Sequence, residues 1–138
     1  MAGFNTMSEE IKSIAYSTLS CWTGEEYLIK LINNYVKIVC EYSVNGELKK
    51  TLEIEQEIWQ NLTDKLFLII KQKNYFWNNH YFISGDFVTD TGSMKIEIKN
   101  ESEENIEIKC MNKPPEIFKE FLLIMYDIYY ERIKDKNV

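Results

Sequence analysis

The spacing of apolar residues changes along this chain, and these changes predict the order of its elements. Apolar residues recur at every second position over most of the first half, and then at helical spacing over about residues 55–73. Alternation returns after Gly92, and helical spacing returns after Pro115. A period of two is typical of strands and a period of 3.6 of helices, so the predicted order is β-β-β-β-α-β-β-α. This is an α+β fold, with a mainly antiparallel sheet of about six strands and two helices packed on one face.

Turn residues separate the predicted strands. Thr23-Gly24 ends the first strand, and Asn33-Asn34 and Asn45-Gly46 are placed to form tight hairpin turns because asparagine and glycine tolerate positive φ. The first four strands are therefore expected to form an antiparallel meander. Asn100 to Asn105 is the expected turn of a later hairpin. From Glu26 to Ile32, Tyr27, Ile29 and Leu31 alternate with Leu28, Lys30 and Ile32. The other strands are each expected to carry an apolar stripe on one face, formed by Ile14, Tyr16 and Thr18, by Val36, Ile38, Cys40 and Tyr42, by Met94, Ile96 and Ile98, and by Ile106, Ile108 and Cys110.

The two predicted helices, near residues 55–73 and 115–133, supply the rest of the core. The first has glutamates at its start and lysines at its end, which suits the helix dipole. The second opens on Pro114-Pro115, and proline is well placed in a first helical turn. The helical residues expected in the core are Ile58, Leu62, Leu66, Ile69, Phe118, Phe121, Leu122 and Met125.

Residues Asn74 to Gly92 fit neither period, and a long connection is predicted there. The segment mixes aromatic and polar residues, including the only histidine of the chain, His80. Long connections in compact domains are often functional. This segment is therefore the first candidate for a binding surface.

Length and charge restrict the classes of function. The chain has 138 residues, with 22 Asp and Glu against 16 Lys and Arg and a net charge of −6. We expect one domain spanning residues 1–138. The acidic balance and the lack of a basic stripe argue against nucleic-acid binding. The longest apolar run is too short for a membrane helix, and the first residues lack the features of a secretory signal, so a cytoplasmic location without membrane attachment is expected.

No recognisable catalytic or cofactor motif occurs in the sequence. The lone His80 has no partner at the spacing of a known triad, and no glycine-rich phosphate loop is present. The three cysteines, Cys21, Cys40 and Cys110, form no C-x-x-C pair, and the acidic residues do not have the spacing of a calcium loop. We therefore expect no enzyme activity, no bound cofactor and no metal. Cys40 and Cys110 are expected to be buried thiols.

Trp59 and Trp77 lie near the start and just past the end of the first predicted helix. The head of the second carries Asn112, Pro115, Phe118 and Phe121. With these residues, the part of the chain from Ile54 to the second helix resembles a family of small, largely uncharacterised bacterial α+β proteins. The pattern of that family is an amphipathic helix with a tryptophan near its start and another just past its end, then a D-G-x-x-W turn into a hairpin, then N-x-x-P-x-x-F at the head of the last helix. The middle motif departs, since residues 90–94 displace the glycine by one and place Met94 at the tryptophan position. The resemblance implies the fold and a likeness to toxin-immunity proteins, and it implies no catalytic residue.

Two hypotheses of function follow. The first is an acidic immunity protein that occludes the active site of a bacterial toxin, such as a basic nuclease toxin. The alternative is a stand-alone accessory or ligand-binding domain that uses the sheet face opposite the helices. The first predicts a protein partner and a monomer or weak homodimer. The residues expected to contact the partner are Trp77, His80, Tyr81, Asp86, Asp90, Glu101, Glu103 and Glu104.

Overall fold

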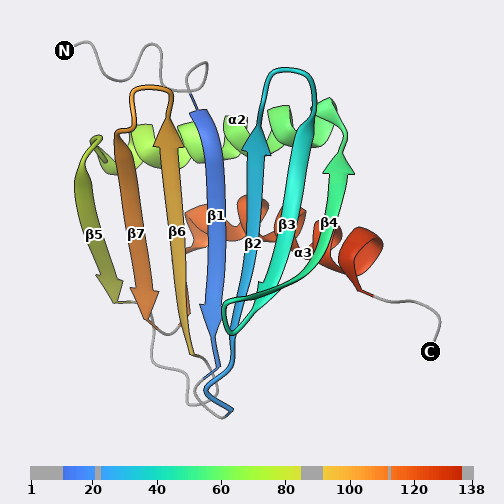
Figure 1. Cartoon of the computed structure of the whole chain (residues 1–138). Coiled ribbons are helices and arrows are strands. Elements are labelled where there is room, and N and C mark those ends of the chain that lie inside the picture. The colour runs from blue at the N-terminus through green and yellow to red at the C-terminus, as the bar shows by residue number, and fades with distance from the viewer. Residues whose placement is uncertain (1–10, 21–22, 85–91, 112, 135–138) are drawn as a thin grey trace.

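Seven strands form one sheet, and two helices pack against it (Figure 1). The computed structural model describes residues 11–20, 23–84, 92–111 and 113–134. The α+β prediction is confirmed, with one strand more than expected. The elements are β1 (Ile11–Leu19), β2 (Glu26–Asn33), β3 (Ile38–Val44), β4 (Glu47–Ile54), α2 (Gln56–Lys73), β5 (Asn79–Ser84), β6 (Ser93–Asn100), β7 (Asn105–Met111), the 3-10 turn η1 (Glu116–Phe118), α3 (Lys119–Ile128) and the π-helical turn η2 (Tyr129–Ile133).

The first strand lies at the centre of the sheet. The strand order is β4-β3-β2-β1-β6-β7-β5, so β1 pairs with β2 on one side and with β6 on the other. Strands β1 to β4 form the antiparallel meander that was predicted. All pairs are antiparallel except β5 with β7, which is parallel. The β6–β7 hairpin therefore extends the meander through β1.

The seventh strand, β5, lies inside the segment that was predicted to be a connection, and that prediction is wrong for residues 79–84. Tyr81 packs against the core, whereas His80 and Phe82 are exposed on the other face. Both faces of β5 thus carry rings, which hides the polar and apolar alternation of an ordinary strand. A hydrogen bond from the Asn78 amide to the Asn105 carbonyl begins the pairing with β7.

Both helices cover one face of the sheet. Helix α2 begins one residue later than predicted and ends at Lys73, as predicted. The next residue, Asn74, has a φ of 58°, and its N–H caps the carbonyls of the last turn. The second predicted helix is a composite of η1, α3 and η2. It begins as a 3-10 turn in which the Phe118 amide bonds to the Pro115 carbonyl.

The core lies between the helices and the inner face of the sheet. Residues Leu62, Leu66, Ile69, Phe118, Phe121 and Met125 are buried there as predicted, together with Cys40 and Cys110. Trp59, which belongs to the family-like pattern, is also buried. Ile58 and Leu122 are only partly buried, because Ile58 lies in the first turn of α2 and Leu122 lines a pocket at the edge of the core.

The two predicted hairpin turns differ in mechanism. At the β3–β4 turn, Asn45 and Gly46 both adopt positive φ, at 51° and 83°, as predicted. At the β2–β3 turn, the residue with positive φ is Tyr35, at 74°. Asn33 and Asn34 act there through their side-chain carbonyls, which accept backbone N–H groups of the turn.

Candidate functional site

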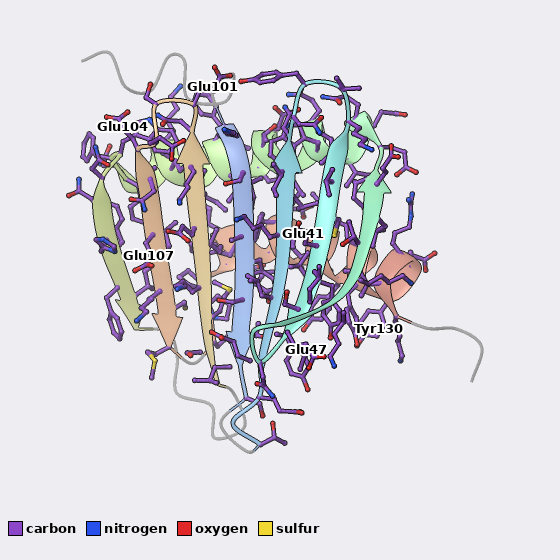
Figure 2. The ribbon with its side chains drawn as sticks, in the orientation of Figure 1. Glu41, Glu47, Glu101, Glu104, Glu107 and Tyr130 are labelled. Carbon is purple, nitrogen blue, oxygen red and sulfur yellow. The ribbon has the colours of Figure 1, made fainter. Side chains whose placement is uncertain are left out.

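The outer face of the sheet is the candidate site, because none of the described helices lies over it (Figure 1). Figure 2 shows Glu41 on β3 and Glu107 on β7, each about halfway along its strand, and it places Glu101 and Glu104 at the β6–β7 tip. Strand alternation fixes which side chains reach this face. Its residues are Ser13, Ala15, Ser17 and Leu19 from β1, Glu26, Leu28, Lys30 and Ile32 from β2, Val39, Glu41 and Ser43 from β3, Leu48, Thr51 and Glu53 from β4, His80 and Phe82 from β5, Ser93, Lys95, Glu97 and Lys99 from β6, and Asn105, Glu107, Lys109 and Met111 from β7.

A furrow runs along the centre of the outer face. Its floor is β1, which presents the small side chains of Ser13, Ala15 and Ser17, while β2 and β6 present longer ones on either side. At the middle of the furrow, Ala15 is paired with Lys30 on β2 and with Glu97 on β6. The furrow has a volume of about 250 Å³. It is lined by Ser13, Ala15, Ser17, Glu26, Leu28, Lys30, Lys95, Glu97 and Lys99.

The polar groups of the furrow are incompletely paired. Ser13 and Ser17 are only 8% and 6% exposed, and neither hydroxyl has a hydrogen-bond partner among the described residues. No fully buried polar side-chain atom of the described chain lacks a partner, so both hydroxyls must open into the furrow. The ammonium groups of Lys30 and Lys99 likewise lie more than 4.0 Å from every described carboxylate. The furrow thus offers hydroxyl and ammonium groups to a bound molecule.

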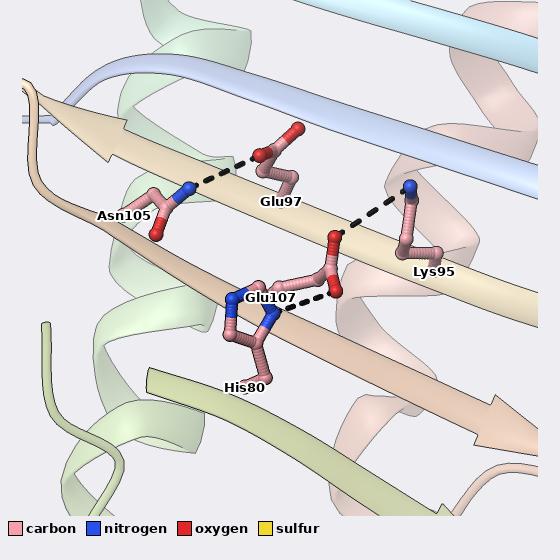
Figure 3. Close-up of polar contacts among 5 residues, drawn as sticks. All are labelled: His80, Lys95, Glu97, Asn105 and Glu107. Carbon is pink, nitrogen blue, oxygen red and sulfur yellow. Dashed lines mark hydrogen bonds and ion pairs between the residues drawn. The ribbon is translucent and has the colours of Figure 1, made fainter. Parts of the chain in front are cut away.

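A polar network lies beside the furrow, across β5, β6 and β7 (Figure 3). One oxygen of Glu107 is 2.8 Å from Nδ1 of His80, and its other oxygen is 3.6 Å from Nζ of Lys95. The His80 hydrogen bond lowers the pKa of Glu107, and the charges of Lys95 and Lys109 lower it further. Glu107 therefore stays ionised and holds His80 and Lys95 in place on the outer face.

Large apolar side chains surround this polar centre. Phe82 on the edge strand β5 is 67% exposed, and Leu48 on the opposite edge strand is 55% exposed. Leu19 and Met111 are exposed at one end of the face. A solvated sheet face carries mainly polar side chains, so these four supply most of the exposed apolar surface of this face.

The β6–β7 tip is acidic and ordered. Asn100 is buried, and its side-chain oxygen accepts the amides of Ser102 and Glu104. The Glu104 carboxylate accepts hydrogen bonds from the side chains of Asn100 and Asn78. Glu101 and Glu103 are exposed. The tip thus displays two carboxylates on a hairpin held by Asn100.

The structure separates the sequence-predicted contact residues into several groups. His80 lies on the outer face, and the glutamates Glu101, Glu103 and Glu104 lie at the adjoining tip. Trp77 and Tyr81 are partly buried against the core, on the helix side of the sheet. Asp86 and Asp90 lie outside the described residues, as does Cys21. As a set, these residues remain a prediction.

Sequence reasoning missed the floor of the furrow. The alternation that placed Ile14, Tyr16 and Thr18 on one face of the first strand leaves Ser13, Ala15 and Ser17 on the other face. The available signal was the presence of three small residues in succession on one face of a strand. The sequence did not show that this strand lies at the centre of the sheet, because that position depends on the pairing of β1 with the distant β6.

Reactive groups are sparse in the described part of the chain. Burial raises the pKa of the Cys40 thiol to about 12 and also raises that of Cys110, so both thiols stay protonated in the core. No three His, Cys, Asp or Glu side chains are grouped to hold a metal ion within residues 11–20, 23–84, 92–111 and 113–134. Neither α2 nor any other described helix combines the length and apolar character needed to cross a membrane.

Comparisons with models of protein families, with curated proteins and with solved structures found no match. The likeness to the small bacterial α+β family therefore rests on the residues quoted above. The geometry of the outer face carries the functional argument.

Proposed function

We propose that this chain is a non-enzymatic binding protein that receives a protein partner on the outer face of its sheet. The observation that carries the proposal is the exposure of Leu19, Leu48, Phe82 and Met111 on a sheet face that no described helix covers. Interfaces between proteins combine apolar side chains with hydrogen-bonding groups, and this face presents both. An exposed ring such as Phe82 is the kind of side chain that anchors such contacts.

The charge of the chain supports a basic partner, and we propose a bacterial toxin domain, such as a nuclease, as that partner. A net charge of −6 attracts a cationic surface over long range. Glu101 and Glu103 are displayed next to the outer face and can approach a cationic substrate groove. Occluding that groove would neutralise the toxin without any chemistry on the part of this chain.

The test is complex formation with the product of the neighbouring gene, measured with purified proteins. Phe82→Ser and Leu48→Ser alter the two opposite edges of the outer face, and each should weaken the complex about tenfold or more. The matched control is Leu68→Ser, since Leu68 is 52% exposed on α2, on the helix side. The association rate should fall about tenfold or more between roughly 10 and 150 mM ionic strength. No complex, or equal weakening by the Leu68 variant, would refute the proposal.

A second candidate function is favoured by the furrow itself. The unpartnered hydroxyls of Ser13 and Ser17, with the ammonium groups of Lys30 and Lys99, suit a small molecule that carries a carboxylate or phosphate group. Titration with succinate and with inorganic phosphate, followed by NMR, tests this function. Saturable shifts confined to the furrow would favour it, and they should disappear in Ala15→Phe, which fills the floor.

A further inference from the structure

A second cavity lies on the inner side of the sheet, where β1, β2 and β3 meet α3 and η2. Its volume is about 250 Å³, and we call it the tyrosine pocket because six of the nine tyrosines of the chain line it. It is separate from the outer face and plays no part in the function proposed above. Its lining is Tyr16, Thr18, Tyr27, Ile29, Tyr42, Leu122, Met125, Tyr126, Tyr129 and Tyr130.

Two sets of rings build the tyrosine pocket. Tyr16, Tyr27 and Tyr42 come from three neighbouring strands, at positions that alternate towards the helices. Tyr126, Tyr129 and Tyr130 follow the i, i+3, i+4 spacing, which places them on one side of the C-terminal helical segment. Figure 2 shows Tyr130 at that segment, beside the sheet.

Contacts between the rings hold the helical wall against the strands. The ring centroids of Tyr42 and Tyr129 are 5.7 Å apart, and those of Tyr129 and Tyr130 are 5.0 Å apart in an edge-to-face arrangement. The wall continues into a π-helical turn, in which the Lys134 amide bonds to the Tyr129 carbonyl at 2.7 Å. Turns of this kind are common at the C-termini of helices.

The rings of the tyrosine pocket and one neighbouring carboxylate can attract a cation. None of its lining residues carries a formal charge when the phenols are protonated. The Tyr27 hydroxyl donates a 2.6 Å hydrogen bond to Glu25, which brings a carboxylate beside the lining. The ring system already attracts one ammonium group from the chain, since Nζ of Lys134 lies 5.1 Å from the Tyr130 centroid.

The phenols themselves remain neutral. Burial raises the pKa of Tyr16 and of Tyr42 to about 12. The hydrogen bond to Glu25 raises the pKa of Tyr27. Any attraction for a cation therefore comes from the electron-rich ring faces and from Glu25, not from a tyrosinate.

We propose that the tyrosine pocket binds a small organic cation, an alkylated ammonium or guanidinium group no larger than an arginine side chain. The volume lies below the range of roughly 300–1,000 Å³ that is usual for drug-sized ligands, so only a compact group can enter. Aromatic rings with a neighbouring carboxylate form the arrangement that holds such cations in water. The cation can come from a free small molecule or from a side chain of a protein partner.

The experiment compares cations with neutral molecules of the same shape. Choline is paired with its carbon analogue, in which a tert-butyl group replaces the trimethylammonium group. N-acetylarginine amide is paired with N-acetylcitrulline amide. Binding is measured by NMR of ring-labelled tyrosines. We expect a Kd of about 1–10 mM for at least one cation, and about tenfold weaker binding of its neutral counterpart.

Variants at the rim locate the binding site. Tyr126 and Tyr130 are 57% and 48% exposed, so Tyr126→Leu and Tyr130→Leu should fold normally and weaken cation binding about tenfold. Tyr130→Phe keeps the ring and should retain binding. Glu25→Gln should weaken binding of the cation and not of the neutral analogue. The matched control is Tyr35→Leu, which removes an exposed tyrosine at the other end of β2.

The outcomes separate the sources of the cation and test the proposal itself. Binding of choline alone indicates a free alkylammonium ligand, and binding of the arginine amide indicates a partner side chain. Equal binding of cation and neutral analogue would overturn the proposal, because the tyrosine pocket would then be merely apolar. No saturable binding of either cation would overturn it as well. Because the probes are small molecules, these results do not depend on whether the outer face binds a protein.

Discussion

Tyr16 of β1 and Phe121 of α3 meet edge to face, with ring centroids 6.0 Å apart and ring planes inclined at 77°. The contact joins the central strand of the sheet to the helix that covers it. Phe121 is fully buried, whereas Tyr16 also lines the tyrosine pocket. One pair of rings thus connects the core to the second proposed binding site.

Phe121→Ala is expected to lower the free energy of unfolding by about 3–5 kcal/mol, because it removes a fully buried ring and leaves a cavity against Tyr16. Urea denaturation measures the change. Leu123→Ala on the same helix is the matched control, since Leu123 is 47% exposed. It should change the free energy by about 0.5 kcal/mol or less. Equal effects of the two substitutions would show that Phe121 is not a core residue.

Local periodicity was sufficient to predict most of the fold. The stripe through Leu62, Leu66 and Ile69 predicted α2 within one residue of its observed start. The alternation in Met94 to Cys110 predicted the β6–β7 hairpin. Strand β5 was missed because exposed Phe82 follows inward-facing Tyr81, so the two faces look alike in the sequence. Its parallel pairing with β7 is a contact between distant segments that no local pattern encodes.

The candidate sites were harder to predict than the fold. The composition predicted a protein that acts through its surface, but not which surface. The furrow requires β1 to lie between β2 and β6, and the tyrosine pocket requires three strands to meet α3. Tyr129 is partly buried against the core, where aromatic residues at helical spacing are usually found. Tyr126 and Tyr130 are exposed beside it and form the rim of the tyrosine pocket. Their spacing in the sequence does not show whether they line a pocket or pack in the core.

Gly46→Ala is expected to lower the free energy of unfolding by about 1–2 kcal/mol, because Gly46 has a φ of 83° that an alanine adopts only with strain. No atom lies within 4 Å of a Cβ built at Gly46, so the cost comes from the backbone and not from a clash. Gly46→Asn should cost less, since asparagine tolerates positive φ. Thermal and urea denaturation provide the comparison. Identical costs for alanine and asparagine would contradict this explanation.

Cys40 and Cys110 are expected to resist thiol reagents in the native protein. Both are buried, and burial raises the pKa of both, so the reactive thiolate is scarce. The test uses a Cys21→Ser variant and a colorimetric thiol assay at about pH 8, which is near the unperturbed pKa of a free thiol. No thiol should react in native buffer, and both remaining thiols should react in denaturant. Prompt reaction of either thiol in native buffer would place it outside the core.

Glu107 should make stability depend on pH in the acid range. Its pKa is lowered in the folded protein, first by the hydrogen bond with His80 and then by Lys95 and Lys109. The unfolded state therefore binds the proton more readily, and the stabilisation is complete above the unfolded pKa of about 4.3. It is lost as the pH falls through the lower, folded value.

The measurement is the difference in unfolding free energy between wild type and Glu107→Gln, taken from urea denaturation at a series of pH values. The difference should be largest near pH 6 and should shrink as the pH falls below the unfolded pKa of about 4.3 and through the lower, folded value. His80→Gln should reduce the same pH dependence, because it removes the group that lowers the pKa most. Since the His80 side chain is 70% exposed, the effect should be modest and should weaken with added salt. A difference that stays constant from neutral to acid pH would show that the network in Figure 3 does not hold Glu107 in its ionised form.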